Sequence, residues 1–227
     1  MENKAAVHIR EYGGLLEIPE KAALKWLAKR IPRCVNSDHL SLLGLISMFA
    51  AGGSFWMASK NRWVLLLVVL SLALNWFGDS LDGTIARYRN CQRPRYGYYV
   101  DHVIDLLGIA ALLTGMAYSG FMNHAIALAL LAVYSLVEAE VFLSAHVQQI
   151  FRLSCFWIGP TELRIILSIG ALRLLYKPSV VIAGRGPFML FDVGGLVAIA
   201  GLMTAFLYSA IRNTRTLYRL EPLAKNN

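Results

Sequence analysis

Charged residues are scarce in this chain of 227 residues. Lys, Arg, Asp and Glu together make up 16% of it, well below the roughly 25% of an average soluble domain. Hydrophobic residues make up 57%, and the mean hydropathy is +0.52. This composition excludes an ordinary soluble domain and predicts an integral membrane protein.

Cysteine is also scarce. The three cysteines, Cys34, Cys91 and Cys155, are odd in number, widely separated and without metal-ligand spacing. We therefore expect no disulfide framework. The first 35 residues lack the apolar core of a signal peptide, and no internal repeat or low-complexity segment is evident.

Acidic residues are fewer than basic ones, 14 against 22, which gives a net charge of +8. The basic residues lie at the ends of apolar runs rather than in one stripe. This distribution favours membrane topology and anionic headgroups over nucleic acid. We therefore expect membrane lipids as partners and no nucleic acid.

Long apolar runs, in contrast, are abundant. Six of them have about the length that a helix needs to cross a hydrocarbon core of ~30 Å, and they lie at roughly 39–58, 63–83, 97–119, 123–146, 160–176 and 188–211. The fifth is the least clean, because it carries Glu162, Arg164 and Arg173. The runs predict an all-α polytopic membrane protein with six transmembrane helices, in a domain over 36–212 followed by a cytoplasmic tail over 213–227.

A shorter amphipathic segment precedes the first run, inside the polar region 1–35. Hydrophobic side chains share one helical face of it, and charged ones occupy the other: Leu24, Leu27, Ala28 and Ile31 against Glu20, Lys21, Lys25 and Lys29. Pro19 suits a first helical turn, and Pro32 ends the segment. The segment is too short and too charged to span, so it predicts an interfacial helix in the membrane plane. An ordinary amphipathic surface helix is the alternative.

The distribution of Lys and Arg between the loops predicts the orientation. With both termini inside, 16 of these residues lie on the cytoplasmic side and four on the other, leaving Arg164 and Arg173 uncounted within the fifth run. This asymmetry predicts cytoplasmic termini, in the cell membrane if the source is bacterial. The end of the second run and the start of the third then face the cytoplasm.

The sparse acidic residues gather at that cytoplasmic end. Asp79 and Asp82 are three residues apart and Asp101 and Asp105 are four apart, so each pair shares a helix face. Two facing helices would present four carboxylates to one point, an all-oxygen environment suited to Mg²⁺ or Mn²⁺. The alternative is a set of solvated acids paired with the neighbouring arginines, which are Arg87, Arg89, Arg93 and Arg95.

The same stretch resembles the signature of the CDP-alcohol phosphotransferase (CDP-alcohol phosphatidyltransferase) family, Asp-x-x-Asp-Gly-x-x-Ala-Arg followed by Gly-x-x-x-Asp-x-x-x-Asp. Every fixed position is filled: Asp79, Asp82, Gly83, Ala86, Arg87, Gly97, Asp101 and Asp105. Upstream, Asp38, Ser41 and Gly44 resemble the Asn-x-x-Thr-x-x-Gly of many relatives, with Asp38 in place of Asn. The resemblance implies transfer of a substituted phosphate from a CDP-linked donor to an alcohol hydroxyl, with release of CMP, in phospholipid biosynthesis. It also implies a homodimer.

The resemblance further implies roles for individual residues. The metal ligands of two Mg²⁺ or Mn²⁺ ions would be Asp79, Asp82, Asp101 and Asp105, and Asp105 would also act as the catalytic base for the acceptor alcohol. The nucleotide would lie against Asp79, Asp82, Gly83, Ala86, Arg87 and Gly97. Close helix packing is the alternative explanation for Gly83 and Ala86.

Two further residues are candidates for contact with the acceptor. His102 resembles the Asp-His of the choline and ethanolamine phosphotransferase branch, while packing is its alternative role. Arg164 is a candidate for phosphate or acceptor contact, and snorkelling to the interface is its alternative. Glu138 and Glu140 lie deep in the fourth run as functional candidates, and their spacing predicts that they face different directions.

The direction of transfer stays open at this point. Either CDP-diacylglycerol donates to a soluble polar alcohol, which the short six-span chain favours, or CDP-choline or CDP-ethanolamine donates a headgroup to diacylglycerol, which His102 favours. A function from another class is a cation transporter that uses the acidic cluster. It is disfavoured because the acids lie at one membrane end, whereas transporter sites lie near the midplane.

Overall fold

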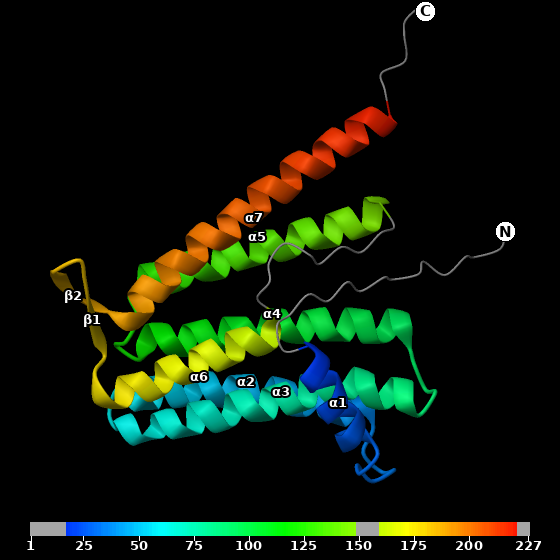
Figure 1. The fold of residues 1–227 in the computed structure, drawn as a ribbon, viewed down its shortest axis with the longest axis horizontal. Helices are drawn as coiled ribbons and strands as arrows, with labels where there is room; N and C mark the ends of the chain where they lie inside the picture. The colour runs from blue at the N-terminus through cyan, green and yellow to red at the C-terminus, as the bar shows by residue number, and fades with distance from the viewer. Residues whose placement is uncertain (1–16, 149–158, 222–227) are drawn as a thin grey trace, which may run out of the picture.

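The computed structural model describes residues 17–148 and 159–221, and these are almost entirely helical (Figure 1). The elements are α1 (Glu17–Ala28), α2 (Ser37–Ala58), the 3₁₀ turn η1 (Arg62–Val64), α3 (Leu65–Tyr88), α4 (Pro94–Tyr118), α5 (His124–Gln148), α6 (Pro160–Tyr176), β1 (Ser179–Ile182), β2 (Arg185–Met189) and α7 (Leu190–Leu220). Every predicted apolar run therefore falls on a helix.

Five helical segments of the described chain are long and apolar enough to cross a membrane: α2, η1 with α3, α4, α5 and α7. The predicted fifth span coincides with α6, which has 17 residues and is shorter than these five. The structure thus confirms a mostly helical chain with several membrane-spanning candidates. The count of six spans stays a prediction.

The all-α prediction misses one element, a β-hairpin between α6 and α7. β1 and β2 pair antiparallel, with Val180 opposite Phe188. β-branched residues in β1 favour a strand, and Ala183 and Gly184 make the turn with positive φ angles of 50° and 74°. The strand pattern of β1 is present in the sequence, but it spans only four residues.

α2 is the element on which the site is built, because α3 and α4 both pack closely against it. A Cβ atom added to Gly78 on α3 would lie 2.5 Å from the carbonyl oxygen of Leu40, and one added to Gly115 on α4 would lie 1.9 Å from that of Gly52. Neither contact is sterically allowed, so these positions require glycine. Small residues of this kind let membrane helices approach closely, and here they bring α3 and α4 to the same helix.

The largest group of buried apolar side chains lies between α2, α3 and α4 and extends to α6 and the start of α7. Phe55 is fully buried there and meets Phe191 of α7 edge to face, with 5.6 Å between ring centroids. This core fixes the helices in the half of the bundle that lies away from the acidic residues.

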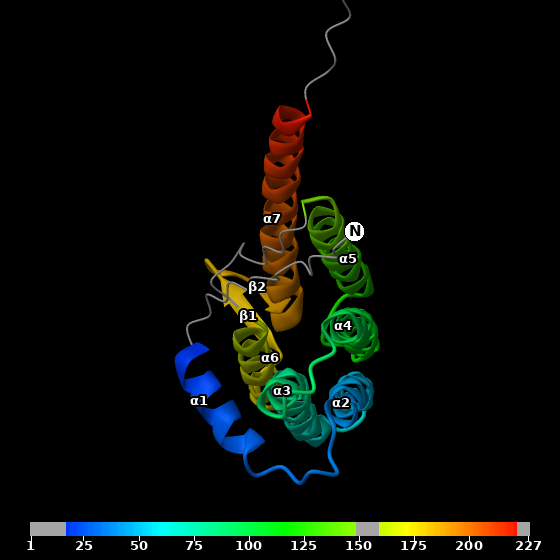
Figure 2. The same cartoon turned by 90° about the vertical axis from the view of Figure 1, so that its right-hand side faces the viewer.

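α1 packs against the outer side of α3 and runs across the direction of the bundle helices (Figure 2). Leu24 and Ala28 are buried against Leu81 and Ile85. The predicted apolar face, which includes Leu27 and Ile31 in addition to these two, is thus confirmed as the face that meets the bundle. Helical structure begins at Glu17, two residues before Pro19.

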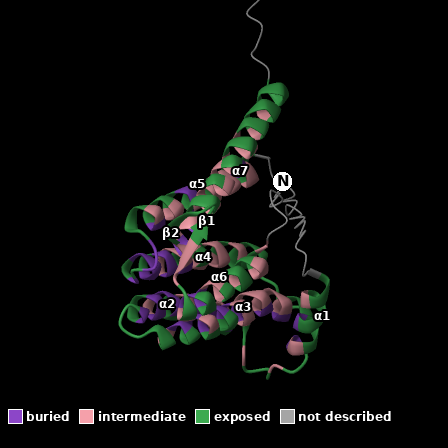
Figure 3. Cartoon of the chain, turned by 60° about the vertical axis from the view of Figure 1, so that its left-hand side comes forward, coloured by how far each residue is buried: buried purple, intermediate pink, exposed green. Residues whose placement is uncertain are grey.

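α5 and α7 form a pair that diverges from the other helices (Figure 1). Both are largely exposed, whereas the buried residues concentrate on α2, α3 and α4 (Figure 3). Glu140 on α5 accepts hydrogen bonds from Ser209 at 2.8 Å and Asn213 at 2.7 Å, both on α7. α7 continues to Leu220, well past residue 211, so the first part of the predicted tail is helical.

Candidate active site

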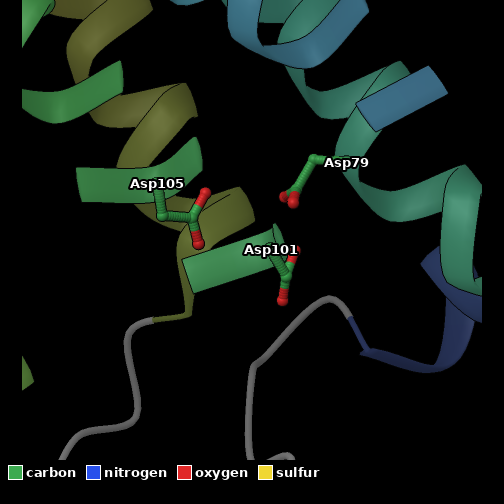
Figure 4. Close-up of side chains that lie close together, drawn as sticks. All are labelled: Asp79, Asp101 and Asp105. Atoms are coloured by element: carbon green, nitrogen blue, oxygen red, sulfur yellow. The ribbon is translucent and has the colours of Figure 1, made fainter. Parts of the chain in front are cut away.

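Three of the predicted acids meet at one point between α3 and α4. Asp79 comes from α3, and Asp101 and Asp105 come from successive turns of α4. One carboxylate oxygen of each lies within 4.8 Å of the others, and Figure 4 shows the three side chains close together. The expectation that two facing helices present their acids together is confirmed for these residues.

The fourth acid, Asp82, lines the same small cavity of about 10 Å³ but lies outside this group of three. One of its oxygens accepts a hydrogen bond from Ser41 of α2 at 2.5 Å. The other accepts one from the backbone N–H of Gly83. The cavity is lined by Ser41, Gly44, Asn75, Asp79, Asp82, Asp101, Ile104 and Asp105. Asp82 thus shares the cavity, and its metal ligation stays a prediction.

Arg164 reaches this site from α6. Its guanidinium donates to Asp79 at 2.5 Å and to the side-chain oxygen of Asn75 at 2.7 Å. Asn75 in turn donates to the backbone carbonyl of Gly44 at 3.0 Å. Arg164 therefore contacts the acidic site instead of extending to the membrane surface, and Asn75 fixes its position.

The donor set fits a divalent cation. Four carboxylates and one guanidinium carry a formal charge of −3 around a cavity with three convergent oxygens. Like charges at this spacing repel one another unless cations or protons compensate them. An all-oxygen carboxylate set is the environment that Mg²⁺ and Mn²⁺ prefer, so these residues suit such an ion.

The glycines of the motif face open space rather than another helix. A Cβ on Gly97 would meet no atom within 4 Å, and one on Gly83 would meet only the Arg87 side chain of its own helix. The alternative of close helix packing therefore has no support at Gly83. Arg87 is exposed and donates to Thr84 at 3.3 Å.

The His102 side chain packs against α5. Its ring stacks near Tyr98 and Phe142, with centroids at 4.1 and 5.1 Å, and its Nδ1 lies 2.7 Å from the carbonyl oxygen of Tyr98. Glu138 interacts electrostatically with both His102 and Asp101. Because Glu140 instead contacts α7, the prediction that the two glutamates face different directions is confirmed.

Sequence reasoning missed Asn75 and Glu20. Asn75 is a buried amide within an otherwise apolar run, and polar residues inside membrane helices are a recognised sign of function, so this signal was available. Glu20 accepts hydrogen bonds from Trp76, Ser80 and Thr161. Its place on the charged face of an amphipathic segment concealed that role.

A profile of the CDP-alcohol phosphatidyltransferase family matches residues 38–209. The chain belongs to this family. The matched CDP-alcohol phosphatidyltransferase region covers most of the chain and contains the whole acidic site. It confirms the predicted family and, at the level of the family, the transferase class, the role in phospholipid biosynthesis and the membrane association.

Two relatives add detail. The archaetidylinositol phosphate synthase of Pyrococcus horikoshii is 27% identical over 89 residues, which are 39% of this chain and 44% of that protein. The crystal structure of Mycobacterium tuberculosis phosphatidylinositol phosphate synthase with CDP-DAG bound superposes with a TM-score of 0.56 at 18% identity, covering 91% of this chain and 98% of that one. The structural likeness confirms the fold of a CDP-alcohol phosphatidyltransferase.

Proposed function

We propose that this protein transfers a substituted phosphate from CDP-diacylglycerol to an alcohol hydroxyl and releases CMP. The convergence of Asp79, Asp101 and Asp105 in a complete family motif is the observation that carries the proposal. Both similar proteins are synthases of inositol phosphate lipids, and one was crystallised with CDP-DAG. These relatives favour the lipid as donor.

Asp79, Asp101 and Asp105, with Asp82 beside them, would hold two Mg²⁺ or Mn²⁺ ions. Bound metal would neutralise the negative charge on the diphosphate and on the departing CMP. Arg164 already compensates part of the charge on Asp79. The protein thus supplies the donor atoms and their positions.

The nucleotide would lie along the exposed side of α3, against Asp79, Asp82, Gly83, Ala86, Arg87 and Gly97 of the motif. The open space over Gly83 and Gly97 supports this placement. The Arg87 guanidinium lies over Gly83, where it would pair with a phosphate oxygen. Its one hydrogen bond to a described residue is long, at 3.3 Å, so the guanidinium can turn toward a ligand.

Asp105 would accept the proton of the attacking hydroxyl. A new bond then forms between the acceptor oxygen and the phosphorus that carries diacylglycerol, and the bond from that phosphorus to CMP breaks. Arg164, with its guanidinium inside the site, would contact a phosphate or the acceptor. His102 packs against Phe142 of α5.

The architecture of the membrane-bound protein is part of the proposal. α6 would be a sixth, shorter span, α1 an interfacial helix, and the termini and active site cytoplasmic. The crossing direction of α1 supports its in-plane orientation (Figure 2). We propose three parts: a polar N-terminal region with the interfacial helix over 1–35, a catalytic domain over 36–212 and a cytoplasmic tail over 213–227. We also propose that the protein is a homodimer.

The test is CMP release by purified protein in detergent with Mg²⁺, from CDP-diacylglycerol and a panel of soluble alcohols. We expect the wild type to be active with at least one alcohol. Asp101→Asn and Asp105→Asn should each reduce turnover by at least about a hundredfold, since one removes a metal ligand and the other the base. Glu221→Gln, an exposed carboxylate outside the site, is the matched control. Normal turnover in both aspartate variants would refute the proposal.

The opposite direction, headgroup transfer from CDP-choline or CDP-ethanolamine to diacylglycerol, is the second candidate. The observation that favours it is the pair Asp101-His102, which resembles the Asp-His of the choline and ethanolamine phosphotransferase branch. Activity with these donors only, lost in His102→Ala, would establish it.

Metal flux into liposomes without CMP release would instead indicate a cation transporter.

A further inference from the structure

Glu20 of α1 joins three helices through a single carboxylate oxygen. Its Oε1 accepts hydrogen bonds from Trp76 Nε1 at 2.7 Å, Thr161 Oγ1 at 2.8 Å and Ser80 Oγ at 3.2 Å. Trp76 and Ser80 belong to α3, and Thr161 lies in the first turn of α6. A carboxylate near a helix N-terminus also interacts favourably with the helix dipole. Glu20 is therefore well placed to hold α3 and α6 together.

The contacts of Glu20 lie directly beside those of Arg164. Thr161 precedes Arg164 by three residues, so the two share one side of α6. On α3, the donors Trp76 and Ser80 directly follow the two residues that Arg164 contacts. Glu20 and Arg164 thus fix the same part of α6 to the same part of α3.

α1 itself is anchored by a second, independent set of contacts. Arg89, just after α3, donates to the carbonyl oxygens of Ile31 and Pro32 at 3.0 Å and of Val35 at 2.5 Å. Hydrogen bonds from a charged donor are stronger than neutral ones. The connection between α1 and α2 is therefore held to the end of α3. This attachment keeps α1, and with it Glu20, in place.

We propose that Glu20 is a positioning residue of the active site. It holds the first turn of α6 against α3, so that the Arg164 guanidinium reaches Asp79 and Asn75. The effect on turnover rests on the proposed function, whereas the effect on the position of α6 does not. α1, which lies outside the acidic cluster, thus sets the position of the Arg164 guanidinium in the site.

The first measurement is independent of activity. Spin labels at Lys25→Cys on α1 and Ile166→Cys on α6, both exposed, report the distance between these helices in a background with the three native cysteines replaced by serine. We expect Glu20→Ala to broaden the distance distribution. Glu20→Gln should largely preserve it, because the amide oxygen still accepts hydrogen bonds from donors on both α3 and α6. An unchanged distribution in Glu20→Ala would overturn the proposal.

The second measurement separates positioning from general stability. Glu20→Ala should lower kcat/KM for CMP release by roughly ten- to a hundredfold, as misplacement of a contact group does, and Glu20→Gln should stay within about threefold. In an Arg164→Ala background the added effect of Glu20→Ala should be less than about twofold, because the two act as one unit. Multiplicative losses would refute action through Arg164.

Two further variants complete the design. Lys25→Ala, on the exposed side of the same helix, should leave turnover unchanged. If Glu20→Ala does not fold, Thr161→Val removes the α6 donor alone and should reproduce both effects more weakly; normal values there would overturn the proposal. A wild-type protein without CMP release from any donor would refute the proposed function, while the label distances would still decide the role of Glu20.

Discussion

The α2–α3–α4 core and the α5–α7 pair are built in different ways. In the most apolar stretches of α2, α3 and α4, 39, 39 and 33% of the residues are buried, against 11% in α5 and 17% in α7. The core helices meet through glycines that allow backbone contact. The pair meets partly through the polar contacts of Glu140.

This difference explains where the acids lie. Three carboxylates come within 4.8 Å of one another only if the backbones that carry them are held firmly, and close glycine contacts provide such a support. Charge repulsion within the cluster opposes this arrangement, so the packing of α2 against its neighbours must outweigh it. The α5–α7 pair carries no comparable cluster within the described residues.

Among changes in the α2–α3–α4 core, removal of divalent metal should have the largest effect on activity. Chelation with EDTA should lower CMP release by about a hundred- to a thousandfold, since charge neutralisation by metal contributes several kcal/mol to such reactions. Added Mg²⁺ or Mn²⁺ should restore it, whereas Ca²⁺ titration measures the selectivity. Full activity in the chelator would contradict a metal-dependent site.

A larger residue at the α2–α4 contact is expected to have the next largest effect. In Gly115→Val the new side chain would overlap the backbone of Gly52, which should cost about 1–3 kcal/mol of stability as overpacking does and move α4 with its two acids. Thermal unfolding in detergent and Mn²⁺ binding measure the two consequences. Gly53→Val, one residue from that contact and facing open space, is the control.

Disruption of the polar contacts between α5 and α7 should have a smaller effect. Glu140→Ala removes the acceptor of two hydrogen bonds, and interhelical hydrogen bonds in membranes average about 0.6 kcal/mol. We expect a slightly lower unfolding temperature and CMP release within about twofold of the wild type. A large loss of activity would show that the pair contributes to the site and would remove the contrast with the core.

The smallest effect is expected at the rim of the core. Asp38 pairs with the exposed Arg93, and this interaction raises the pKa of the guanidinium. Exposed ion pairs contribute little to stability, so Asp38→Asn should leave the unfolding temperature unchanged and CMP release within about twofold. The same variant also introduces the residue that many relatives carry, and a marked gain or loss of activity would assign Asp38 a role in the reaction.

Much of the site could be predicted from the sequence because its members are local. Asp79 and Asp82 share one helix, as do Asp101 and Asp105, and helical spacing alone groups each pair. The meeting of three of these acids followed from placing both pairs at the same membrane end. Apolar length likewise located the helices.

Long-range polar contacts could not be predicted in this way. Arg164 lies 85 residues from Asp79, and Glu20 lies 141 residues from Thr161. Helical periodicity contains no information about which helix faces which. The close contact of Gly52 and Gly115 was equally invisible, since glycine in a membrane helix is common and only the observed backbone distance separates a required glycine from a tolerated one.

The length of α7 has a consequence for the bilayer. Its 31 residues extend about 46 Å at 1.5 Å per residue, against a hydrocarbon core of about 30 Å. A rigid rod of this length must tilt or project into water, and the tilt increases as the bilayer becomes thinner. Because Glu140 joins α5 to α7 through two hydrogen bonds, a change of lipid thickness that tilts α7 acts on α5 as well.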